Sequence, residues 1–395
     1  MTGLRANINR IPVDYRADKQ HKCNFTHMKQ AILFTFVFSL SAFAQQIISP
    51  EVQADRRVVF RLSAPNAKEV KLHCDGVNNA VMQKDEHGVW AFTSDPLEPD
   101  IYTYSFRVDG VRMIDPANSS LKYNLLNFDS QVYVPGPQSL PWEVNDVPRG
   151  LLHHHFYKSA VAEDNRDFIV YTPPGYDPSA RKRYPVLYLL HGYSDDASAW
   201  SEAGRANVIL DNLIASGQAK PMIVVMPLGY GTMDMVKGGP SRTRMSDLWP
   251  RSLAKFSDTL LDEVMPQVEK TYRVNQDRQA RAIAGLSMGG AESLVVGLKH
   301  LERFAWIGAF SAGGVGTNYA GQFPALNAKA NDQLRLLWLG CGQEDKLIKG
   351  NQQFCDWLKS QGIHYTWVES TGAHNFRVWR RYLAEFVPRL FQDRR

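Results

Sequence analysis

The sequence of 395 residues predicts an all-β region followed by a larger α/β region with a doubly wound sheet. Three observations lead to this prediction. Short strand-like stretches separated by turn residues fill the segment from 50 to about 135. From residue 151 onward, apolar runs of strand length alternate with helix-like segments. Between them, residues 136–150 are rich in proline, so we expect this segment to be a linker.

The all-β region is expected to span residues 45–135 and to form a sandwich. Its strand-like stretches alternate polar and apolar residues or are continuously apolar, and pairs such as Asp75-Gly76 and Asp109-Gly110 mark the turns between them. The predicted strands are residues 58–62, 70–74, 89–93 and 102–108.

The α/β region is expected to span residues 151–395. Continuously apolar runs of five or six residues are typical of parallel strands that are buried on both faces. The predicted strands are residues 166–171, 185–190, 221–226, 281–284, 305–310, 334–339 and 365–369. The predicted helices are residues 206–214, 253–272 and 290–298, a helix around Cys355 and a C-terminal helix from Phe376.

Composition and charge favour an ordinary globular protein. Hydrophobic residues make up 44% of the chain, charged residues 22%, and the formal net charge is +5. The basic residues are interspersed with acidic ones and form no block with aromatic residues, so we expect no nucleic acid partner. We also expect no stable membrane anchor, because no later segment is apolar enough to cross a bilayer.

The N-terminal residues predict export from the cell. Residues 28–44 combine a short basic start, an apolar run and an Ala-Phe-Ala cleavage site, as a secretory signal peptide does. We expect Met28 to be the true initiator, and residues 1–27 to be a non-native or disordered extension. The mature protein would then be secreted or periplasmic.

Neither the cysteines nor the clustered histidines indicate a metal site. The chain has four cysteines and no C-x-x-C pair, and Cys341 and Cys355 could form a disulfide or remain buried thiols. The adjacent histidines His153, His154 and His155 lie in a strand-like stretch, where neighbouring side chains point to opposite faces. We therefore expect no bound metal and no other cofactor.

The most informative motif is the G-x-S-x-G sequence of residues 285–289, with Ser287 at its centre. An apolar strand-like run precedes it and a helix-like run follows it. This strand–serine–helix order is that of a nucleophile elbow, a tight turn that needs small neighbours and leaves the serine hydroxyl exposed. Ser287 is therefore the candidate nucleophile.

A serine hydroxyl is a weak nucleophile at neutral pH and needs a base that is oriented by an acid. In such folds the chain order is serine, acid and histidine, each following a strand. His374 follows the last predicted strand and is the candidate base. Glu344 and Asp345 both follow the strand before it, and either could be the acid.

The oxyanion of an acyl-transfer intermediate needs two N–H donors. The backbone amide of Met288 is one candidate, and that of Tyr193, after an early strand, is the other. His191 precedes that turn and is expected to brace it. The long loop after residue 226 is expected to line the substrate pocket with Tyr230 and Trp249.

With these residues placed, the α/β region resembles carbohydrate esterase family 1, which includes feruloyl esterases and acetylxylan esterases. The matching strings are residues 184–192, 212–215, 226–227, 285–290, 341–345 and 372–374. The resemblance implies an α/β-hydrolase fold, with Ser287 as nucleophile, His374 as base and Asp345 rather than Glu344 as the acid.

The all-β region resembles the immunoglobulin-like carbohydrate-binding modules of family 48, through residues 60–67, 88–90 and 115–118. Residues 75–80 lack the tryptophan that starch-binding members carry after an Asn-Gly turn. Together with the predicted signal peptide, the two resemblances imply a secreted serine esterase acting on feruloyl esters of a polysaccharide such as arabinoxylan. The alternatives are an acetylxylan esterase, a siderophore esterase, an acyltransferase, or a carbohydrate-binding protein with an inactive hydrolase half.

Overall fold

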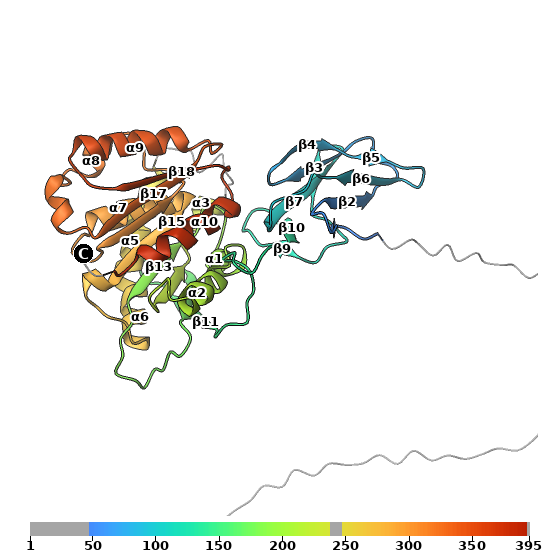
Figure 1. The fold of residues 1–395 in the computed structure, drawn as a ribbon. Coiled ribbons are helices and arrows are strands. Elements are labelled where there is room, and N and C mark those ends of the chain that lie inside the picture. The colour runs from blue at the N-terminus through green and yellow to red at the C-terminus, as the bar shows by residue number, and fades with distance from the viewer. Residues whose placement is uncertain (1–46, 238–246, 393–395) are drawn as a thin grey trace, which may run out of the picture. The chain divides into compact units, whose positions relative to one another are not determined.

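The computed structural model describes residues 47–237 and 247–392. The predicted signal peptide, the extension before it and Cys23 lie outside these residues. The α/β-hydrolase fold and the all-β region before it, both predicted from the sequence, are present in the structure (Figure 1).

The all-β region is a sandwich of two antiparallel sheets. One sheet has the strand order β1 (Glu51–Val52), β2 (Val58–Ser63), β6 (Val89–Thr93) and β5 (Gln83–Lys84). The other has the order β4 (Val77–Val81), β3 (Val70–Cys74), β7 (Asp100–Val108), β10 (Asp129–Val134) and β9 (Leu121–Lys122), with β8 (Val111–Met113) paired to β7. Phe60 from the first sheet and Tyr104 and Phe106 from the second meet in the core between the sheets.

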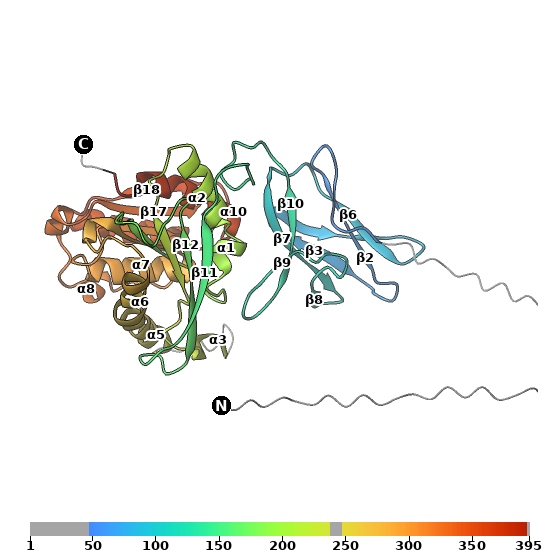
Figure 2. The same cartoon turned by 90° about the horizontal axis from the view of Figure 1, so that it is seen from below.

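The α/β region contains an eight-stranded sheet. Its order is β11 (Leu151–Lys158), β12 (Asn165–Thr172), β14 (Ile223–Pro227), β13 (Val186–Leu190), β15 (Arg281–Leu286), β16 (Trp306–Phe310), β17 (Leu336–Gly342) and β18 (Thr366–Ser370). β12 is antiparallel to both of its neighbours, and every pair from β14 to β18 is parallel. β11 and β12 lie side by side at one edge of the sheet (Figure 2). β13 and β14 have all five residues buried, because helices cover both faces of the sheet.

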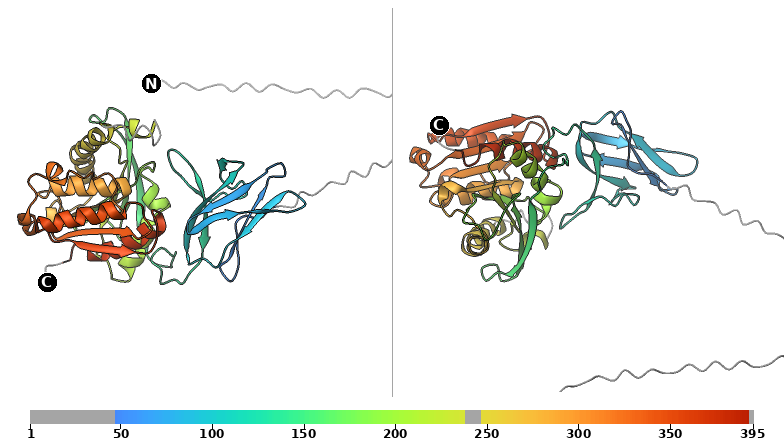
Figure 3. Two further views of the ribbon diagram at one scale, coloured as in Figure 1. Left: turned by 90° about the horizontal axis from the view of Figure 1, so that it is seen from above. Right: turned by 60° about the horizontal axis from the view of Figure 1, so that its bottom comes forward.

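Two groups of helices enclose this sheet, as further views show (Figure 3). Leu187 and Leu189 of β13 pack with α1 (Ala199–Glu202), α2 (Ala206–Ala215) and α10 (Phe376–Phe386). Tyr188 and Leu190 point to the other face. They pack with α5 (Leu248–Asp258), the π-helical turn η1 (Thr259–Val264), α6 (Met265–Thr271), α7 (Ser287–Lys299) and α9 (Ile348–Ser360).

The other helices in the described part of the chain are short. They are α3 (Asp234–Lys237), α8 (Tyr319–Gln322) and the 3-10 turns η2 (Arg278–Ala280), η3 (Ala328–Asp332) and η4 (Val387–Arg389). The single helix predicted over residues 253–272 is in fact α5, η1 and α6 in succession, and it starts earlier, at Leu248. α7 likewise begins at Ser287 itself rather than at Gly290.

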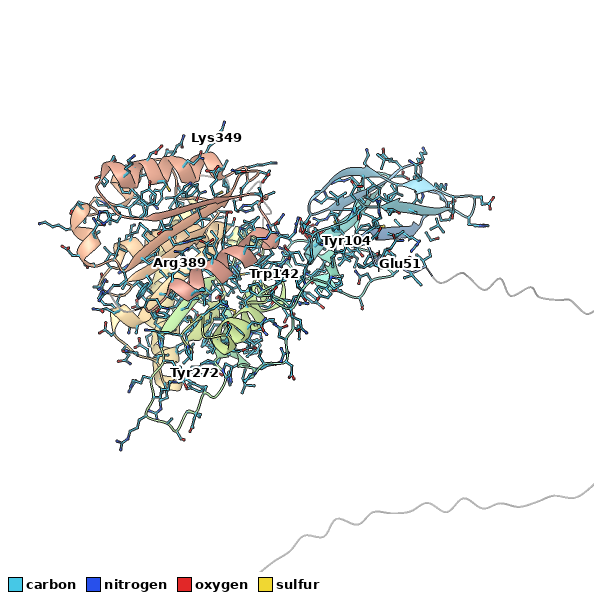
Figure 4. The ribbon with its side chains drawn as sticks, in the orientation of Figure 1. Glu51, Tyr104, Trp142, Tyr272, Lys349 and Arg389 are labelled. Carbon is cyan, nitrogen blue, oxygen red and sulfur yellow. The ribbon has the colours of Figure 1, made fainter. Side chains whose placement is uncertain are left out.

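The proline-rich segment 136–150 packs against the α/β region. Trp142, labelled in Figure 4, is only 5% exposed and lies among the residues of α2 and α10. The side-chain amide of Asn212 donates hydrogen bonds to the carbonyls of Pro141 (2.8 Å) and Glu143 (2.7 Å). The segment predicted as a linker is therefore a docked part of the structure.

The described cysteines form no disulfide, and the three adjacent histidines have different hydrogen-bond partners. Cys74, Cys341 and Cys355 are buried free thiols, so Cys341 and Cys355 form no disulfide here. The imidazoles of His153, His154 and His155 form hydrogen bonds with three different side chains, those of Thr172, Asp167 and Tyr272. Across residues 47–237 and 247–392, no cluster of His, Cys, Asp and Glu could hold a metal ion, and no helix could cross a membrane.

Candidate active site

Ser287 occupies a sharp turn between β15 and α7. Its φ of +51° is in the left-handed region, which residues other than glycine rarely adopt. A Cβ on Gly285 would come within 2.5 Å of the Gly289 carbonyl, and one on Gly289 within 2.5 Å of the His191 carbonyl. The two glycines of the motif are therefore required for the tight crossing of strand, turn and helix.

The structure brings together the three side chains that the sequence singled out as a catalytic set. The Ser287 hydroxyl lies 2.9 Å from Nε2 of His374, and Nδ1 of His374 lies 2.7 Å from Oδ2 of Asp345. A neutral imidazole that donates from Nδ1 to Asp345 can accept the serine proton at Nε2. β15, β17 and β18 are parallel, so the residues after their carboxyl ends meet at one edge of the sheet.

Asp345 is buried and held by several donors. The Leu347 amide donates to its Oδ1 at 2.9 Å, and the Ser311 hydroxyl is a further donor. Burial alone would raise the pKa of Asp345, but the hydrogen bond from His374 and these two donors lower it below the ordinary value. Asp345 is therefore a carboxylate that can orient the imidazole.

Glu344, the other candidate acid, has a different partner. Its side chain is exposed and accepts a hydrogen bond from the backbone amide of Gly372. It ties the loop after β17 to the turn before His374, whereas the imidazole itself contacts Asp345. The geometry thus resolves the pair that the residue types alone left open.

The turn predicted to supply an oxyanion donor lies beside Ser287. A Cβ on Gly192 would be 3.4 Å from the Cβ of Ser287, and the Gly289 amide donates to the His191 carbonyl at 3.0 Å. Ser287 is also the first residue of the 13-residue helix α7, whose N-terminal amides carry partial positive charge. The Tyr193 turn and the Met288 end of α7 therefore flank the serine.

His191 braces this turn, as expected. Its Nε2 accepts a hydrogen bond from the Gly229 amide at 2.8 Å, and its Nδ1 donates to the Gly192 carbonyl at 2.8 Å. Complete burial lowers the pKa of His191, and the accepting nitrogen requires the neutral ring. His191 is therefore a neutral structural histidine that joins two loops.

The prediction that Tyr230 lines the substrate pocket is wrong. Tyr230 is fully buried, and its hydroxyl donates toward the carbonyls of Asp195 (3.1 Å) and Gly192 (3.4 Å). The ring turns inward beneath the turn of residues 192–195 because a buried tyrosine hydroxyl needs acceptors, and these carbonyls provide them.

Trp249 lies at an open groove. Its indole Nε1 donates to the Gly314 carbonyl at 2.8 Å, and its ring lines an open groove of about 640 Å³ together with Leu253, Val295 and Val315. Gly313, next to this groove in the chain, donates its amide to the Ser287 carbonyl at 2.9 Å.

A second pocket, of about 220 Å³, opens directly at Ser287 and His374. Part of its wall comes from the all-β region, whose contributing side chains are polar: Asp75, Thr103, Lys122, Asn124 and Asp129. Sequence reasoning missed these residues, since no motif marks them and they lie far from the catalytic residues in the chain.

The comparisons agree with this site. A family model named Esterase, with the description "Putative esterase", matches residues 159–390. An endo-1,4-beta-xylanase/feruloyl esterase of Xylanibacter ruminicola is 30% identical over 351 residues, which are 87% of this chain and 46% of the relative. The chain therefore spans about half the length of that relative.

Solved structures share the fold. A ferulic acid esterase is 27% identical, with a TM-score of 0.52 over 62% of this chain and 99% of that one. The enterobactin esterase of Shigella flexneri, at 20% identity, aligns with a TM-score of 0.64 over 84% of this chain and 92% of its own. The matched family, the fold and the hydrogen-bonded serine together identify the chain as a member of the esterase family.

Proposed function

We propose that this protein is a secreted serine esterase that removes feruloyl groups from plant cell-wall polysaccharide such as arabinoxylan. The observation that carries the proposal is the hydrogen-bonded chain from Ser287 through His374 to Asp345 at the carboxyl edge of the sheet. The apolar run and cleavage site of residues 28–44 support the secretion.

The reaction follows from this arrangement. Ser287 Oγ attacks the ester carbonyl while its proton passes to Nε2 of His374, and the amides of Met288 and Tyr193 stabilise the oxyanion. The tetrahedral intermediate collapses, and the sugar oxygen leaves with the proton from His374. Water, activated by the same imidazole, then hydrolyses the acyl-enzyme and releases the acid.

Two features favour a feruloyl group. The relative from Xylanibacter ruminicola, which aligns with 87% of this chain, carries feruloyl esterase in its name. The groove lined by Trp249 and Val315 adjoins the residues beside Ser287 and is partly apolar, as an aromatic acyl group requires. The pocket that opens at Ser287 and His374 has polar side chains in its wall and suits a sugar, which is rich in hydroxyl groups.

An acetyl group is the second candidate. An acetyl esterase of Caldicellulosiruptor saccharolyticus is 22% identical over 232 residues and aligns over 80% of its own length. An acetyl ester would use the same nucleophile, base and oxyanion donors and would leave the Trp249 groove empty.

The two candidates are separated by the acid that is released. Wild-type protein is incubated with feruloylated arabinoxylan and, separately, with acetylated xylan, and ferulate and acetate are quantified by chromatography. We expect kcat/KM for ferulate release to exceed that for acetate release by about 10-fold or more, because burial of a phenyl ring stabilises the transition state by about 1.5–3 kcal/mol. Faster release of acetate would contradict the feruloyl assignment.

Trp249→Ala connects this preference to the groove. It should lower kcat/KM for ferulate release and leave acetate release unchanged. Equal losses on both substrates would show that the groove does not bind the acyl group.

A further inference from the structure

The turn of residues 192–195 must hold a strained shape next to Ser287. Ser194 has a φ of +69°, a conformation that costs a residue other than glycine free energy. From the α/β side, the buried Tyr230 hydroxyl bonds the carbonyls of Gly192 and Asp195. These contacts fix the inner side of the turn and leave its outer side to other groups.

The all-β region holds the outer side of the same turn. Nζ of Lys122 lies 2.7 Å from Oδ1 of Asp195, and Nδ2 of Asn124 lies 3.0 Å from the same oxygen. Nδ2 of Asn124 also donates to the Ser194 hydroxyl at 2.9 Å, and the Leu125 amide donates to the Ser194 carbonyl at 2.7 Å. Four hydrogen bonds, from Lys122 and from the consecutive residues Asn124 and Leu125, therefore converge on two residues of the turn.

These contacts are shielded from solvent. The side chain of Lys122 is 13% exposed and that of Asp195 is 6% exposed, and the ammonium also lies 5.4 Å from the ring centre of Phe376. An ion pair with so little solvent is poorly screened, so its geometry is held more firmly than that of a surface pair.

An apolar contact supports the same junction. Leu126 of the all-β region packs in a cluster with Met288, Tyr193 and the buried ring of Tyr230. Met288 and Tyr193 are the two residues whose amides we assign to the oxyanion. The segment 122–126 thus contacts the surroundings of both donors.

We propose that Lys122 and Asn124 are positioning residues that fix the oxyanion turn, so that the all-β region contributes to the turnover of every ester, small ones included. This inference rests on the proposed role of the Tyr193 and Met288 amides. It differs from a carbohydrate-binding role, which would act only on polymeric substrates and mainly through KM. Loss of a single oxyanion donor typically lowers kcat by 10²–10³-fold, so a partial displacement should already be measurable.

The test uses p-nitrophenyl acetate, a small activated ester with no sugar. In Lys122→Met and Asn124→Ala we expect kcat to fall by about 10-fold or more, with KM changed by less than about 2-fold. Lys122→Arg, which keeps the ion pair with Asp195, should recover most of the loss. Lys84→Met is the matched control, because Lys84 belongs to the same region but bonds the Pro65 carbonyl.

A second readout reports on the oxyanion turn itself. An aryl trifluoromethyl ketone forms a hemiketal oxyanion with the serine, so its inhibition constant should rise in parallel with the loss of kcat. Lys122→Met alone leaves the buried Asp195 carboxylate without its ion pair, which could destabilise the fold. The double variant Lys122→Met/Asp195→Asn removes that unpaired charge and so separates lost positioning from misfolding. Thermal unfolding gives the folded fraction of each variant.

An unchanged kcat per folded molecule, or an effect limited to the KM for polymeric substrate, would overturn the inference. The proposed function fails by a different result. Acetate released faster than ferulate from polysaccharide would refute the feruloyl assignment without affecting the p-nitrophenyl acetate comparison.

Discussion

Asp345 and Glu344 are neighbours in the chain, yet only one of them contacts the imidazole. Asp345 is 2% exposed and bonds Nδ1 of His374, whereas Glu344 reaches the Gly372 amide. An acid in contact with Nδ1 keeps the histidine in the tautomer whose Nε2 can accept the serine proton. Two carboxylates one residue apart should therefore differ widely in their effect on catalysis.

We predict that Asp345→Asn lowers kcat by about 10³–10⁴-fold, since an amide that donates to Nδ1 selects the wrong tautomer. Glu344→Gln should lower kcat by less than about 5-fold, because its loop contact is made by an exposed side chain. Both variants are measured with p-nitrophenyl acetate at pH 7.5. Similar losses in the two variants would contradict the assignment of the acid.

Glu292 is a buried carboxyl group in α7, one turn beyond the nucleophile. It is 1% exposed, and its Oε2 has no hydrogen-bond partner among the described residues. Burial raises the pKa of Glu292 well above the ordinary value of 4.5. The folded protein then keeps this proton while the unfolded chain loses it, so stability falls as pH rises above about 4.5.

We predict that Glu292→Gln removes this pH-dependent penalty. The variant and wild type should have the same stability near pH 4. As pH rises, the stability advantage of the variant over wild type should grow by at most about 1.4 kcal/mol per pH unit, until the folded-state pKa of Glu292 is reached. Urea denaturation at several pH values gives both curves. Glu86→Gln, at a side chain that is 87% exposed, is the control and should follow wild type. A Glu292→Gln curve parallel to that of wild type would refute the prediction.

At the level of elements, the packing of α7 against the end of β13 depends on glycine for space rather than for flexibility. Gly289 lies inside α7, and a Cβ there would meet two backbone carbonyls, those of His191 at 2.5 Å and Leu190 at 2.6 Å. Gly350 lies in α9, where a Cβ would meet no heavy atom within 4 Å. The same substitution should thus have opposite effects in the two helices.

Gly289→Ala should destabilise the protein by about 1–3 kcal/mol and lower kcat, because strand and helix must move apart at the nucleophile. Gly350→Ala should stabilise it by about 0.5–1 kcal/mol, with activity unchanged, since alanine favours the helix. Denaturant midpoints and steady-state kinetics measure both effects. Stabilisation by Gly289→Ala would show that the crossing is less tight than described.

The elements differ in how well the sequence predicts them, for physical reasons. β13 was predictable because all five of its residues are apolar and buried, which the parallel interior of the sheet requires. β5, β8 and β9 have two or three residues each and include Lys84, Arg112 and Lys122, so only their neighbours stabilise them as strands. The π-helical turn η1 could not be predicted, because its apolar residues have the same spacing in the sequence as those of an ordinary amphipathic helix.

The same contrast holds for the site. Ser287 and His374 could be found because their order and their positions after strands are properties of the chain, whereas the same properties left both Glu344 and Asp345 as candidates for the acid. The contact of Lys122 with Asp195 joins residues 73 positions apart, in regions with separate cores, and depends on how those regions pack. Tyr230 was misassigned because loop position does not reveal whether a ring points inward.

For the molecule as a whole, the two folded regions meet around a buried ion pair. The guanidinium of Arg380 bonds Oδ1 of Asp100 at 2.6 Å and the Ile101 carbonyl at 2.7 Å, and neither charged side chain is more than 1% exposed. Arg380 belongs to α10 and Asp100 to β7, so this pair joins the α/β region to the sandwich. A buried charge is stabilised by its oppositely charged partner in place of water, so loss of the partner strongly destabilises the fold.

We predict that Arg380→Met destabilises the protein by about 3–5 kcal/mol, because it leaves the Asp100 carboxylate buried and underpaired. Arg389→Met removes an exposed pair with Glu385 in the same C-terminal segment and should change stability by less than about 0.5 kcal/mol. Urea midpoints compare the two variants. A loss below about 1 kcal/mol in Arg380→Met would mean that the junction contributes little to folding.

The central claim is that Ser287 forms an acyl-enzyme, and rapid-mixing kinetics with p-nitrophenyl acetate test it most directly. Wild type should release a burst of about one p-nitrophenolate per protein molecule, and peptide mass mapping of acid-quenched protein should find the acyl group on Ser287. Ser287→Ala should show no burst, whereas Ser179→Ala, at an exposed loop serine, should retain it. A burst that survives in Ser287→Ala, or an acyl group mapped to another residue, would contradict the account.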